Sequence, residues 1–493
     1  MRLSDLLSSI SFYVREIPKN LPKDLLIKDI KSDHKEVTPG DLFICIKGFT
    51  NDGHQFAKAA AENGAAVIFS EEYVNVSLPT VILSDTKDSL AKIAASFYRH
   101  PSKDLQLIGI TGTNGKTTIT YMLDKIFSLA NKRTGIIGTI ETKIHNRSFS
   151  NKHTTPDPLT LQRMLREMVQ AKVEIVFLEV SSHALAQGRV HGLEFDQAIF
   201  TNLSHDHLDY HATMDRYAFT KSLLFAQLGN SYDIDHQKYV ILNQDDSLFK
   251  LFKQSTAQAV LTYSRLKKAD VWAKDILMTN EGTKFTMVTP KGKIQVSSPL
   301  LGDFNISNML ASACVAIYNG ISLALIKEAF ASIQGIPGRL EVIDFTKKDF
   351  TVIVDYAHTP DSLRKVLQSI RTFSKGDIIL VIGCGGNRDQ SKRLPMAQIA
   401  VRYADYAVFT SDNPRDEDPM QILSHMTEDL KQANFQIEID RKNAIHFAIH
   451  LAKKNDIILI AGKGHESFQE INGKRYPFND RIVAIDAINK KEN

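Results

Sequence analysis

Residues 105–118 read LQLIGITGTNGKTT, a continuous apolar run followed by a loop with glycines, a lysine and threonines. The apolar run is typical of a strand that is buried on both faces of a sheet. The segment after the loop has the character of a helix. A glycine-rich turn between a strand and a helix frees backbone N–H groups at the helix N-terminus, and these groups bind anions. The stretch therefore predicts a phosphate-binding loop in an α/β domain.

The side chains of this loop indicate which phosphates it binds. Lys116 would bring a positive charge to the β- and γ-phosphates of ATP, and the Thr117 hydroxyl would ligate Mg²⁺. The spacing differs from the usual G-x-x-x-x-G-K-[ST], because Ile110 stands where the first glycine belongs. The alternative is an ordinary strand-to-helix turn with an incidental lysine, and the strand–loop–helix context disfavours it. The residues that we expect at the nucleotide are Gly112, Thr113, Asn114, Gly115, Lys116, Thr117 and Thr118.

Similar apolar runs recur on the C-terminal side of the loop. Three of them, at 173–180, 198–203 and 239–243, alternate with helix-like segments, which is the pattern of a parallel sheet with crossover helices. Beyond a Gly/Pro break near 335–342, further runs each have an apolar body and a polar or glycine-rich C-terminal end. These runs are 351–357, 378–386, 406–414 and 457–466. Because ligands of open α/β sheets bind at the carboxyl ends of the strands, these polar ends predict a site.

The first hundred residues mix short strands and helices. We expect a strand at 43–49, a helix at 55–64 that ends at Gly64, and a strand at 65–70. A polar break at 101–104 separates this part from the phosphate loop. A chain of 493 residues is long enough for about three domains. The expected domains are 1–102, 103–335 and 336–493, all of the α/β class.

Composition excludes several classes of protein. Lys and Arg total 60 against 56 Asp and Glu, so the excess charge is too small for a nucleic-acid-binding surface. Three cysteines without a CxxC pair argue against a disulfide scaffold or a zinc ribbon, and the N-terminus lacks a secretory signal. The uncharged stretch 306–326 contains polar residues and an Asn-Gly helix stop, so we expect a buried helix there. A cytoplasmic enzyme without membrane insertion follows.

Candidate metal ligands lie after two of the predicted strands. Glu179 closes one strand, where a carboxylate could complete an Mg-ATP site. The stretch NLSHDHLDYH (202–211) concentrates Asp206, His207, Asp209 and His211. Its spacing matches no standard zinc signature, so zinc and magnesium both remain possible readings of these residues alone.

Six motifs occur in a fixed order, namely GTNGKTT, EVSSHAL, NLSHDHLDYH with a later lysine, DYAHTP, DNPR and GKGHE. Together they resemble the Mur ligases of bacterial peptidoglycan synthesis, over about residues 30–480. The resemblance implies an N-terminal UDP-binding α/β domain, a central P-loop ATPase domain with a parallel sheet, and a Rossmann-like C-terminal domain for the incoming amino acid. It also implies that ATP phosphorylates a carboxylate and that an amine then attacks the acyl phosphate.

The resemblance assigns the catalytic and nucleotide-binding residues. The catalytic set is Lys116, Glu179, His207, Arg339 and Lys221, which lies where the family carries a carbamylated lysine; from spacing alone, Lys221 would be an ordinary lysine. Two Mg²⁺ ions are implied, one held by Thr117 and Glu179 and a second contacted by His207 and Lys221. The remaining contacts to ATP would come from Asn305, Asn308, Asp355, Tyr356 and His358.

The resemblance also places the UDP-linked substrate, UDP-MurNAc-L-Ala-D-Glu. The expected contacts are His34, Phe49, Thr50 and Asn51 for the uridine end, and Thr154, Thr155, Ser181, Gln187 and Arg189 for the peptide end. The family usually shows Asp-Ser-Arg in the first region, whereas this chain has Asp33-His34-Lys35. His153 likewise replaces a usual asparagine.

The identity of the amino acid that the enzyme adds says most about its function. The likeness is strongest to the members that add the third residue of the peptide. A site for meso-2,6-diaminopimelate needs a fixed cation for the distal carboxylate, and Arg415 of the DNPR motif suits this role because arginine binds carboxylates bidentately. The residues expected around this substrate are Arg388, Asp412, Asn413, Pro414, Arg415, Gly462 and Glu466.

Other functions compete with this one. They are a lysine-adding version of the same ligase, a folylpolyglutamate-type ligase, a P-loop kinase or switch NTPase, and a non-enzymatic scaffold. The DNPR and GKGHE motifs and the UDP-type N-terminal domain disfavour the folate reading, whereas a kinase or switch NTPase would need no amino-acid site. GCGG (383–386) lacks the third glycine of a dinucleotide fingerprint, so we do not expect NAD.

The expected partners are small molecules only, and we expect a monomer.

Overall fold

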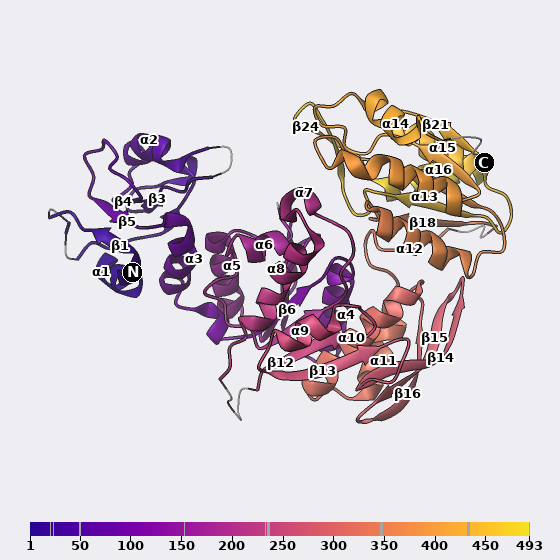
Figure 1. Ribbon diagram of the computed structural model, residues 1–493, viewed down its shortest axis with the longest axis horizontal. Coiled ribbons are helices and arrows are strands. Elements are labelled where there is room, and N and C mark those ends of the chain that lie inside the picture. The colour runs from indigo at the N-terminus through magenta and orange to yellow at the C-terminus, as the bar shows by residue number, and fades with distance from the viewer. Residues whose placement is uncertain are drawn as a thin grey trace.

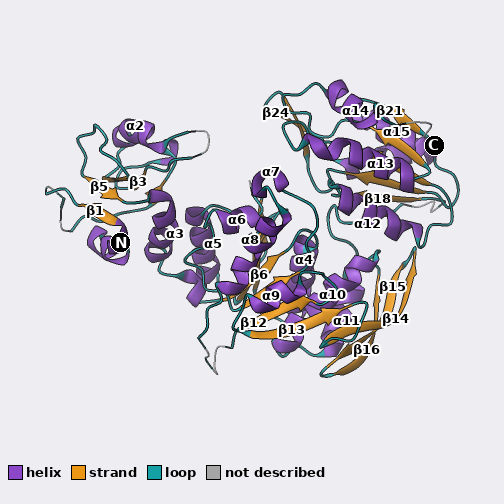
Figure 2. Ribbon diagram, in the orientation of Figure 1, coloured by secondary structure: helices purple, strands orange, loops and turns teal. Residues whose placement is uncertain are grey.

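The computed structural model describes residues 1–493 except 20, 23, 49–50, 152, 232, 234–236, 346–348, 431–433 and 493. Figure 1 shows three bodies, with the N-terminal part in indigo, the central part in magenta and the C-terminal part in orange and yellow. Each body is built on its own sheet with helices against it, as the strand and helix colours of Figure 2 show. The predicted three-domain α/β class is confirmed.

The N-terminal sheet has the order β1-β5-β4-β3-β2, in which only β1 runs antiparallel to its neighbour. Helices α1 and α3 share one hydrophobic core with this sheet, and α2 contributes to the core on the other face. The strands are β1 Val14–Glu16, β2 Ile30–Lys31, β3 Leu42–Ile44, β4 Val67–Ser70 and β5 Thr80–Leu83; the helices are α1 Leu3–Ser9, η1 Ser11–Tyr13, η2 His34–Glu36, η3 Gly53–Phe56, α2 Ala57–Glu62, α3 Thr86–Phe97 and η4 Pro101–Lys103.

Two sequence expectations for this part need correction. The strand expected at 43–49 ends at Ile44, because the chain then folds into a loop in which Gly53 donates its N–H to the Ile46 carbonyl. The helix expected at 55–64 begins as the 3-10 turn η3 and becomes α-helical only at Ala57. Its predicted stop at Gly64 is confirmed, since Gly64 has a φ of +100° that favours glycine.

The central sheet has eleven strands in the order β16-β15-β14-β13-β12-β11-β6-β10-β7-β8-β9. The strands from β14 to β7 are parallel, as predicted, and antiparallel strands extend both edges. The strands are β6 Gln106–Thr111, β7 Thr134–Ile137, β8 Thr142–Ile144, β9 Arg147–Phe149, β10 Ile175–Glu179, β11 Gln197–Phe200, β12 Tyr239–Asn243, β13 Ala259–Ser264, β14 Val271–Thr279, β15 Gly282–Thr289 and β16 Gly292–Ser298. The phosphate-loop strand β6 therefore lies in the middle of the sheet.

Helices cover both faces of this sheet. One core contains α4, α10 and α11, and the core on the opposite face contains α5, α8 and α9. The helices are α4 Lys116–Leu129, α5 Pro158–Gln170, α6 Ser182–Ala186, α7 Leu208–His211, α8 Met214–Ala226, α9 Phe249–Gln254, α10 Asp303–Tyr318 and α11 Leu323–Ser332. The uncharged stretch 306–326 is a buried helix, α10, followed after Gly320 by the start of α11, as expected. Within the described part of the chain, no helix is both long and apolar enough to cross a bilayer.

The C-terminal sheet has the order β17-β18-β22-β19-β20-β21, and all its strands except β17 are parallel. Helices α12, α13 and α14 share a core on one face, and α15 and α16 share a core on the other. The elements are β17 Glu341–Ile343, β18 Thr351–Asp355, α12 Pro360–Arg371, β19 Ile378–Ile382, η5 Gln390–Lys392, α13 Arg393–Tyr403, β20 Tyr406–Phe409, α14 Pro419–Thr427, β21 Phe435–Ile437, α15 Arg441–Leu451, β22 Ile457–Ala461, β23 Phe468–Ile471, β24 Lys474–Pro477 and α16 Asp480–Glu492. Strands β23 and β24 form a separate hairpin.

The N-terminal and central bodies meet along two helices. Helix α3 lies beside α5 in both ribbon views, and Leu159 at the start of α5 belongs to the N-terminal hydrophobic core. Gly192 of the central body lets helix α3 approach closely, because a Cβ at this position would lie 3.0 Å from the Ala95 Cβ and 3.1 Å from the Ala91 carbonyl oxygen. The joint between these bodies is therefore packed hydrophobic structure.

Candidate active site

The phosphate loop follows β6 directly and leads into α4. Gly112 and Gly115 have positive φ values of 145° and 90°, which favour glycine. A Cβ at Gly112 would collide with the Thr201 hydroxyl, and a Cβ at Gly115 would lie 2.5 Å from the Asn308 Oδ1. The loop is therefore packed so tightly that neither glycine can carry a side chain, which leaves its backbone free to approach phosphates.

Two lysine side chains converge on one carbonyl of this loop. Lys116 Nζ donates to the carbonyls of Gly112 at 2.8 Å and Thr113 at 2.9 Å, and Lys221 Nζ donates to the same Gly112 oxygen at 3.0 Å. Lys221 is 1% exposed, and none of the described residues forms an ion pair with it. Burial, and then the nearby charge of Lys116, hold the pKa of Lys221 well below its usual value. Burial also lowers the pKa of Lys116.

Oxygen atoms gather beside the first turn of α4. Glu179, at the end of β10, accepts from the Thr117 hydroxyl at 3.0 Å and from the Thr139 hydroxyl and N–H, each at 2.9 Å. Arg339 donates from Nη2 to the Thr117 hydroxyl at 3.3 Å, which brings a C-terminal residue to the loop. A hydroxyl and a carboxylate are hard oxygen ligands of the kind that Mg²⁺ prefers, so these residues fit a magnesium ion. Sequence reasoning missed Thr139, although its position just after β7, next to β10, was a usable signal.

Three histidines lie together after β10 and β11. The His183 ring is 4.8 Å from the His207 ring and 5.7 Å from the His211 ring, measured between centroids. His207 has a left-handed φ of 55°, and Asp206 accepts from its N–H at 2.9 Å. Burial lowers the pKa of all three histidines to about 4. At neutral pH the rings are therefore uncharged and able to ligate a metal.

The remaining nucleotide candidates come from both sides of the loop. Asn308 is hydrogen-bonded to Asn305 at 3.0 Å. The Asp355 carboxylate accepts the N–H groups of Leu340 and Ala357, each at 2.7 Å, so it shapes the turn that carries Arg339. The Arg339 guanidinium lies 4.6 Å above the Tyr356 ring, and the Tyr356 ring is 4.6 Å from the His358 ring.

The residues proposed for the peptide end of the UDP substrate form one network. Thr155 Oγ1 donates to the Glu179 carbonyl at 2.8 Å and accepts from the Ser181 N–H at 3.0 Å. Arg189 donates to the Thr155 carbonyl at 2.8 Å and to Gln187 Oε1 at 2.7 Å. Thr154 lies next to this network, with its hydroxyl 3.1 Å from that of Thr139. The peptide candidates therefore adjoin the carboxylate of the phosphate site.

The uridine candidates lie in the N-terminal body. The His34 ring is stacked on Phe56, with centroids 4.5 Å apart and an interplanar angle of 5°. The Asn51 carbonyl accepts from the Gly48 N–H at 2.9 Å, which closes the loop after β3. Phe49 and Thr50 lie outside the described residues.

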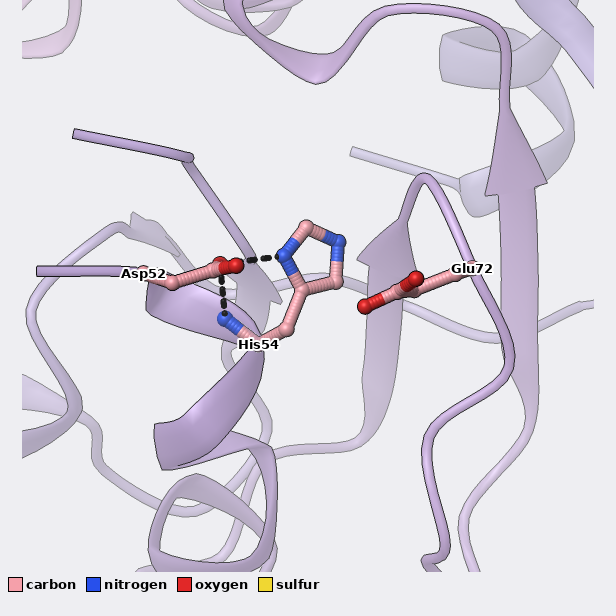
Figure 3. Close-up of side chains that lie close together, drawn as sticks. All are labelled: Asp52, His54 and Glu72. Carbon is pink, nitrogen blue, oxygen red and sulfur yellow. Dashed lines mark hydrogen bonds and ion pairs between the residues drawn. The ribbon is translucent and has the colours of Figure 1, made fainter.

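Asp52, His54 and Glu72 lie close together near this loop and could be taken for metal ligands (Figure 3). However, His54 Nδ1 is 2.6 Å from Asp52 Oδ1, and its Nε2 accepts from the Glu71 N–H at 3.0 Å. Both ring nitrogens are thus already used within the protein. We interpret His54 as a structural residue whose hydrogen bonds link the loop after β3 to the end of β4.

The amino-acid candidates gather at the carboxyl ends of β19, β20 and β22. Lys463 is fully buried and donates to Asn413 Oδ1 at 2.9 Å and to Glu466 Oε2 at 2.8 Å, and Asn413 Nδ2 donates to Glu466 at 2.9 Å. Gly462 has a φ of 110°, and a Cβ there would lie 2.8 Å from the Asp412 carboxylate. Pro414 is buried and Arg388 is exposed. Sequence reasoning missed Lys463, although it stands inside the GKGHE motif.

Two arginines hold the loops of this region. Arg415 contacts Glu470 of β23 through Nε at 3.3 Å and donates from Nη1 to the Gly386 carbonyl at 2.7 Å. Arg441 is fully buried, forms a two-point ion pair with Asp480 at 2.8 Å, and donates to the carbonyls of Ala461 and Ser411. Arg441 thereby ties the ends of β20 and β22 to α16. No motif signalled Arg441, because its partners are distant in sequence.

Family models match three parts of the chain. A model described as the Mur ligase middle domain matches residues 110–316, one described as Mur ligase, glutamate ligase domain matches 338–464, and one described as Mur ligase family, catalytic domain matches 27–98. The three matched ranges follow the central, C-terminal and N-terminal sheets.

Curated relatives and solved structures agree with these matches. The chain is 49% identical to the UDP-N-acetylmuramoyl-L-alanyl-D-glutamate–2,6-diaminopimelate ligase of Bacillus licheniformis, over 99% of both chains. It is 48% identical to the enzyme of the same name from Bacillus cereus, over 97% of this chain and 96% of that one. A solved structure of a ligase with this name covers both chains fully, with a TM-score of 0.69 and 32% identity. A Mycobacterium tuberculosis folylpolyglutamate synthase shares the fold at 16% identity, with a TM-score of 0.63 over 76% of this chain and 92% of that one.

Proposed function

This chain belongs to the Mur ligase family, and we propose that it joins meso-2,6-diaminopimelate to UDP-N-acetylmuramoyl-L-alanyl-D-glutamate in peptidoglycan synthesis, at the expense of ATP. The observation that carries the proposal is the double role of the C-terminal body. Arg339 of this body donates a hydrogen bond to Thr117 of the phosphate loop, and the same body carries the Asn413–Lys463–Glu466 network. A kinase or a switch NTPase would need only the first of these two features.

The chemistry requires an activated carboxylate. The γ-carboxylate of D-glutamate is a poor electrophile, so an oxygen of this group attacks the γ-phosphorus of ATP and ADP leaves. The amine of the incoming amino acid then attacks the acyl phosphate carbon, loses a proton, and displaces inorganic phosphate to give the amide. Negative charge develops on the transferred phosphoryl group, and Lys116 and Arg339 are positioned to stabilise it.

Magnesium would be held by Thr117 and Glu179, with His207 and Lys221 as candidates for a second ion. When bound, Mg²⁺ neutralises phosphate charge and orients the phosphoryl group for in-line transfer. Arg189 and the hydroxyls of Thr155 and Ser181 would orient the peptide carboxylate.

The state of Lys221 is a separate part of the proposal. A neutral amine can attack CO₂, forming a C–N bond and releasing a proton, and the resulting carbamate is anionic. The lowered pKa of Lys221 favours the neutral amine, and the anionic carbamate would attract the Lys116 ammonium group. We expect ¹³C-bicarbonate to give a carbamate resonance that Lys221→Ala lacks, together with a loss of ligase activity. Full activity of Lys221→Ala would rule this role out.

We propose the same roles for the remaining residues and regions as the sequence predicts. They include the domain limits 1–102, 103–335 and 336–493, each of which encloses one of the three large sheets. The uridine end of the substrate is assigned to the loops at His34 and Asn51. Arg388 and Arg415 are assigned to the carboxylates of diaminopimelate, and Glu466 to its ammonium. A monomer in the cytoplasm completes the proposal.

The decisive experiment measures ADP release and amide formation with the purified protein. We expect both products only when ATP, the UDP-muramyl dipeptide and diaminopimelate are all present. L-Lysine in place of diaminopimelate tests the lysine-adding alternative, and a folate with glutamate tests the folylpolyglutamate alternative. Turnover of ATP without amide formation would refute the proposed ligase function.

A further inference from the structure

The β23–β24 hairpin is bonded along the loop that carries Arg415. Arg415 N–H donates to the Glu470 carbonyl at 3.0 Å, and Asn472 N–H donates to the Arg415 carbonyl at 2.7 Å. The Glu470 N–H donates to Asn413 Oδ1 at 3.0 Å, and the Gln469 amide donates to the Asp412 carbonyl at 2.7 Å. The hairpin is therefore a support for the amino-acid site, although it lies outside both motifs that predicted that site.

This support holds Arg415 in an unusual backbone conformation. Its φ of 53° lies in the left-handed region, which residues with a Cβ rarely adopt. Such a conformation persists where surrounding contacts determine it. Here the N–H and the carbonyl of Arg415 are both hydrogen-bonded to the hairpin, at Glu470 and Asn472. The hairpin thus fixes the direction in which the arginine side chain leaves the main chain.

The hairpin also fixes the guanidinium group. The Glu470 carboxylate lies 3.3 Å from Nε, and the Gly386 carbonyl accepts from Nη1 at 2.7 Å. Two contacts at different nitrogens determine the plane of the group. Nη2 has no protein hydrogen-bond partner among the described residues, so it can donate to a substrate carboxylate. The side chains of Arg415 and Glu470 are 20% and 27% exposed, so the pair borders solvent.

We propose that Glu470 is a positioning residue that orients the Arg415 guanidinium and thereby strengthens the preference for an amino acid with a distal carboxylate. The inference rests on the proposed function, because it assigns Arg415 to that carboxylate. An arginine that is oriented before binding loses less conformational freedom on binding, so its interaction with the carboxylate is stronger. Glu470 itself acts through Arg415 and need not touch the substrate.

The test compares Michaelis constants of variants at one position. Glu470→Ala removes the contact to Nε, whereas Glu470→Gln keeps an oxygen that can accept from Nε. We expect Glu470→Ala to raise KM for meso-diaminopimelate about tenfold, with kcat and KM for ATP within about twofold of the wild type. Glu470→Gln should restore KM to within about twofold of wild type. The ratio of kcat/KM for diaminopimelate to that for L-lysine should fall about tenfold in Glu470→Ala only.

Lys474→Ala is the matched control. Lys474 is an exposed charge in the same hairpin, and neither a hydrogen bond nor an ion pair to Arg415 is present in the described structure. This variant should behave as the wild type. If Glu470→Ala does not fold, Glu470→Asp carries the test, because it keeps the charge but shortens the reach, and it should raise KM several-fold.

Several results would overturn the proposal. An unchanged KM for diaminopimelate in Glu470→Ala would show that Arg415 needs no orientation by Glu470. A lower KM would show that Glu470 competes with the substrate carboxylate, and an equal rise for lysine would show a merely structural role. If Glu470→Gln behaved like Glu470→Ala, the charge and not the orientation would matter. Failure of the proposed function itself is distinct, because the wild-type protein would then form no amide with diaminopimelate.

Discussion

The phosphate loop and the proposed amino-acid site are assembled in opposite ways. The loop is one continuous segment, residues 112–118, whose lysine bonds to the carbonyls of its own backbone. The amino-acid site draws on the ends of three strands and on a separate hairpin, joined by the side chains of Lys463, Arg441 and Glu470. The comparison indicates that the phosphate loop itself depends on local sequence, whereas the proposed amino-acid site depends on residues far apart in the chain.

Lys116→Met should produce the largest effect and tests the local character of the loop. The loop fold should survive, because its glycines and its contact with Asn308 remain. The transition state would lose a charge that the loop places at the phosphoryl group, so we expect kcat for ADP release to fall about 10³-fold. The KM for diaminopimelate should stay within about twofold. A comparable change in that KM would show that the two regions are not independent.

Arg441→Met tests whether the amino-acid site depends on its buried support. The change leaves the Asp480 carboxylate, which is 0% exposed, without its partner. Loss of one member of a buried ion pair costs about 3 kcal/mol of unfolding free energy. Urea unfolding followed by circular dichroism measures this loss, and the double variant Arg441→Met with Asp480→Leu should recover part of it. Wild-type stability of Arg441→Met would refute the supporting role.

Arg415→Ala tests the proposed amino-acid site by comparing two substrates. A distal carboxylate without its cation should lower kcat/KM for diaminopimelate about 10²-fold. L-Lysine lacks that carboxylate, so its kcat/KM should change by less than about threefold. Arg415→Lys serves as the control for charge without the planar fork. An equal loss with both amino acids would contradict the assignment of Arg415 to the distal carboxylate.

The smallest expected effect concerns pH. His211 is buried, and its pKa is lowered to about 4, whereas an unfolded histidine binds a proton near pH 6.5. The unfolded state therefore takes up protons between pH 6.5 and 4 that the folded state does not, so stability falls as the pH falls through this window. We expect His211→Gln to remove on the order of 1 kcal/mol of this loss between pH 6.5 and 5. Parallel stability curves for the two proteins would contradict this expectation.

Sequence patterns predicted the strand–loop–helix arrangement around the phosphate loop for a physical reason. The buried strand β6, the glycines and the start of α4 are all determined within about ten residues, and helix α10 is marked by the uncharged stretch that begins at Ile306. The strand ends at Glu179 and Asp355 followed from the rule that parallel strands deliver polar residues to one edge. Element limits were less certain, because the loop after Ile44 is held by Gly53 and His54 and not by a local signal.

The contacts that complete the site could not be read in the same way. Thr139, Lys463, Arg441 and Glu470 act through partners that come from other strands, helices or loops. The left-handed backbone of Arg415 depends on a hairpin more than fifty residues away in the chain. A motif can place a residue type at a strand end, but only the assembled structure determines which neighbours orient it.

The packed joint between α3 and α5 has a practical consequence. Leu159 completes the hydrophobic core of the N-terminal body, and Gly192 meets Ala91 and Ala95 at near-contact distance. A small apolar compound that wedged these helices apart would tilt the first hundred residues away from the rest of the molecule. Such an inhibitor would need no likeness to a nucleotide, a sugar or an amino acid.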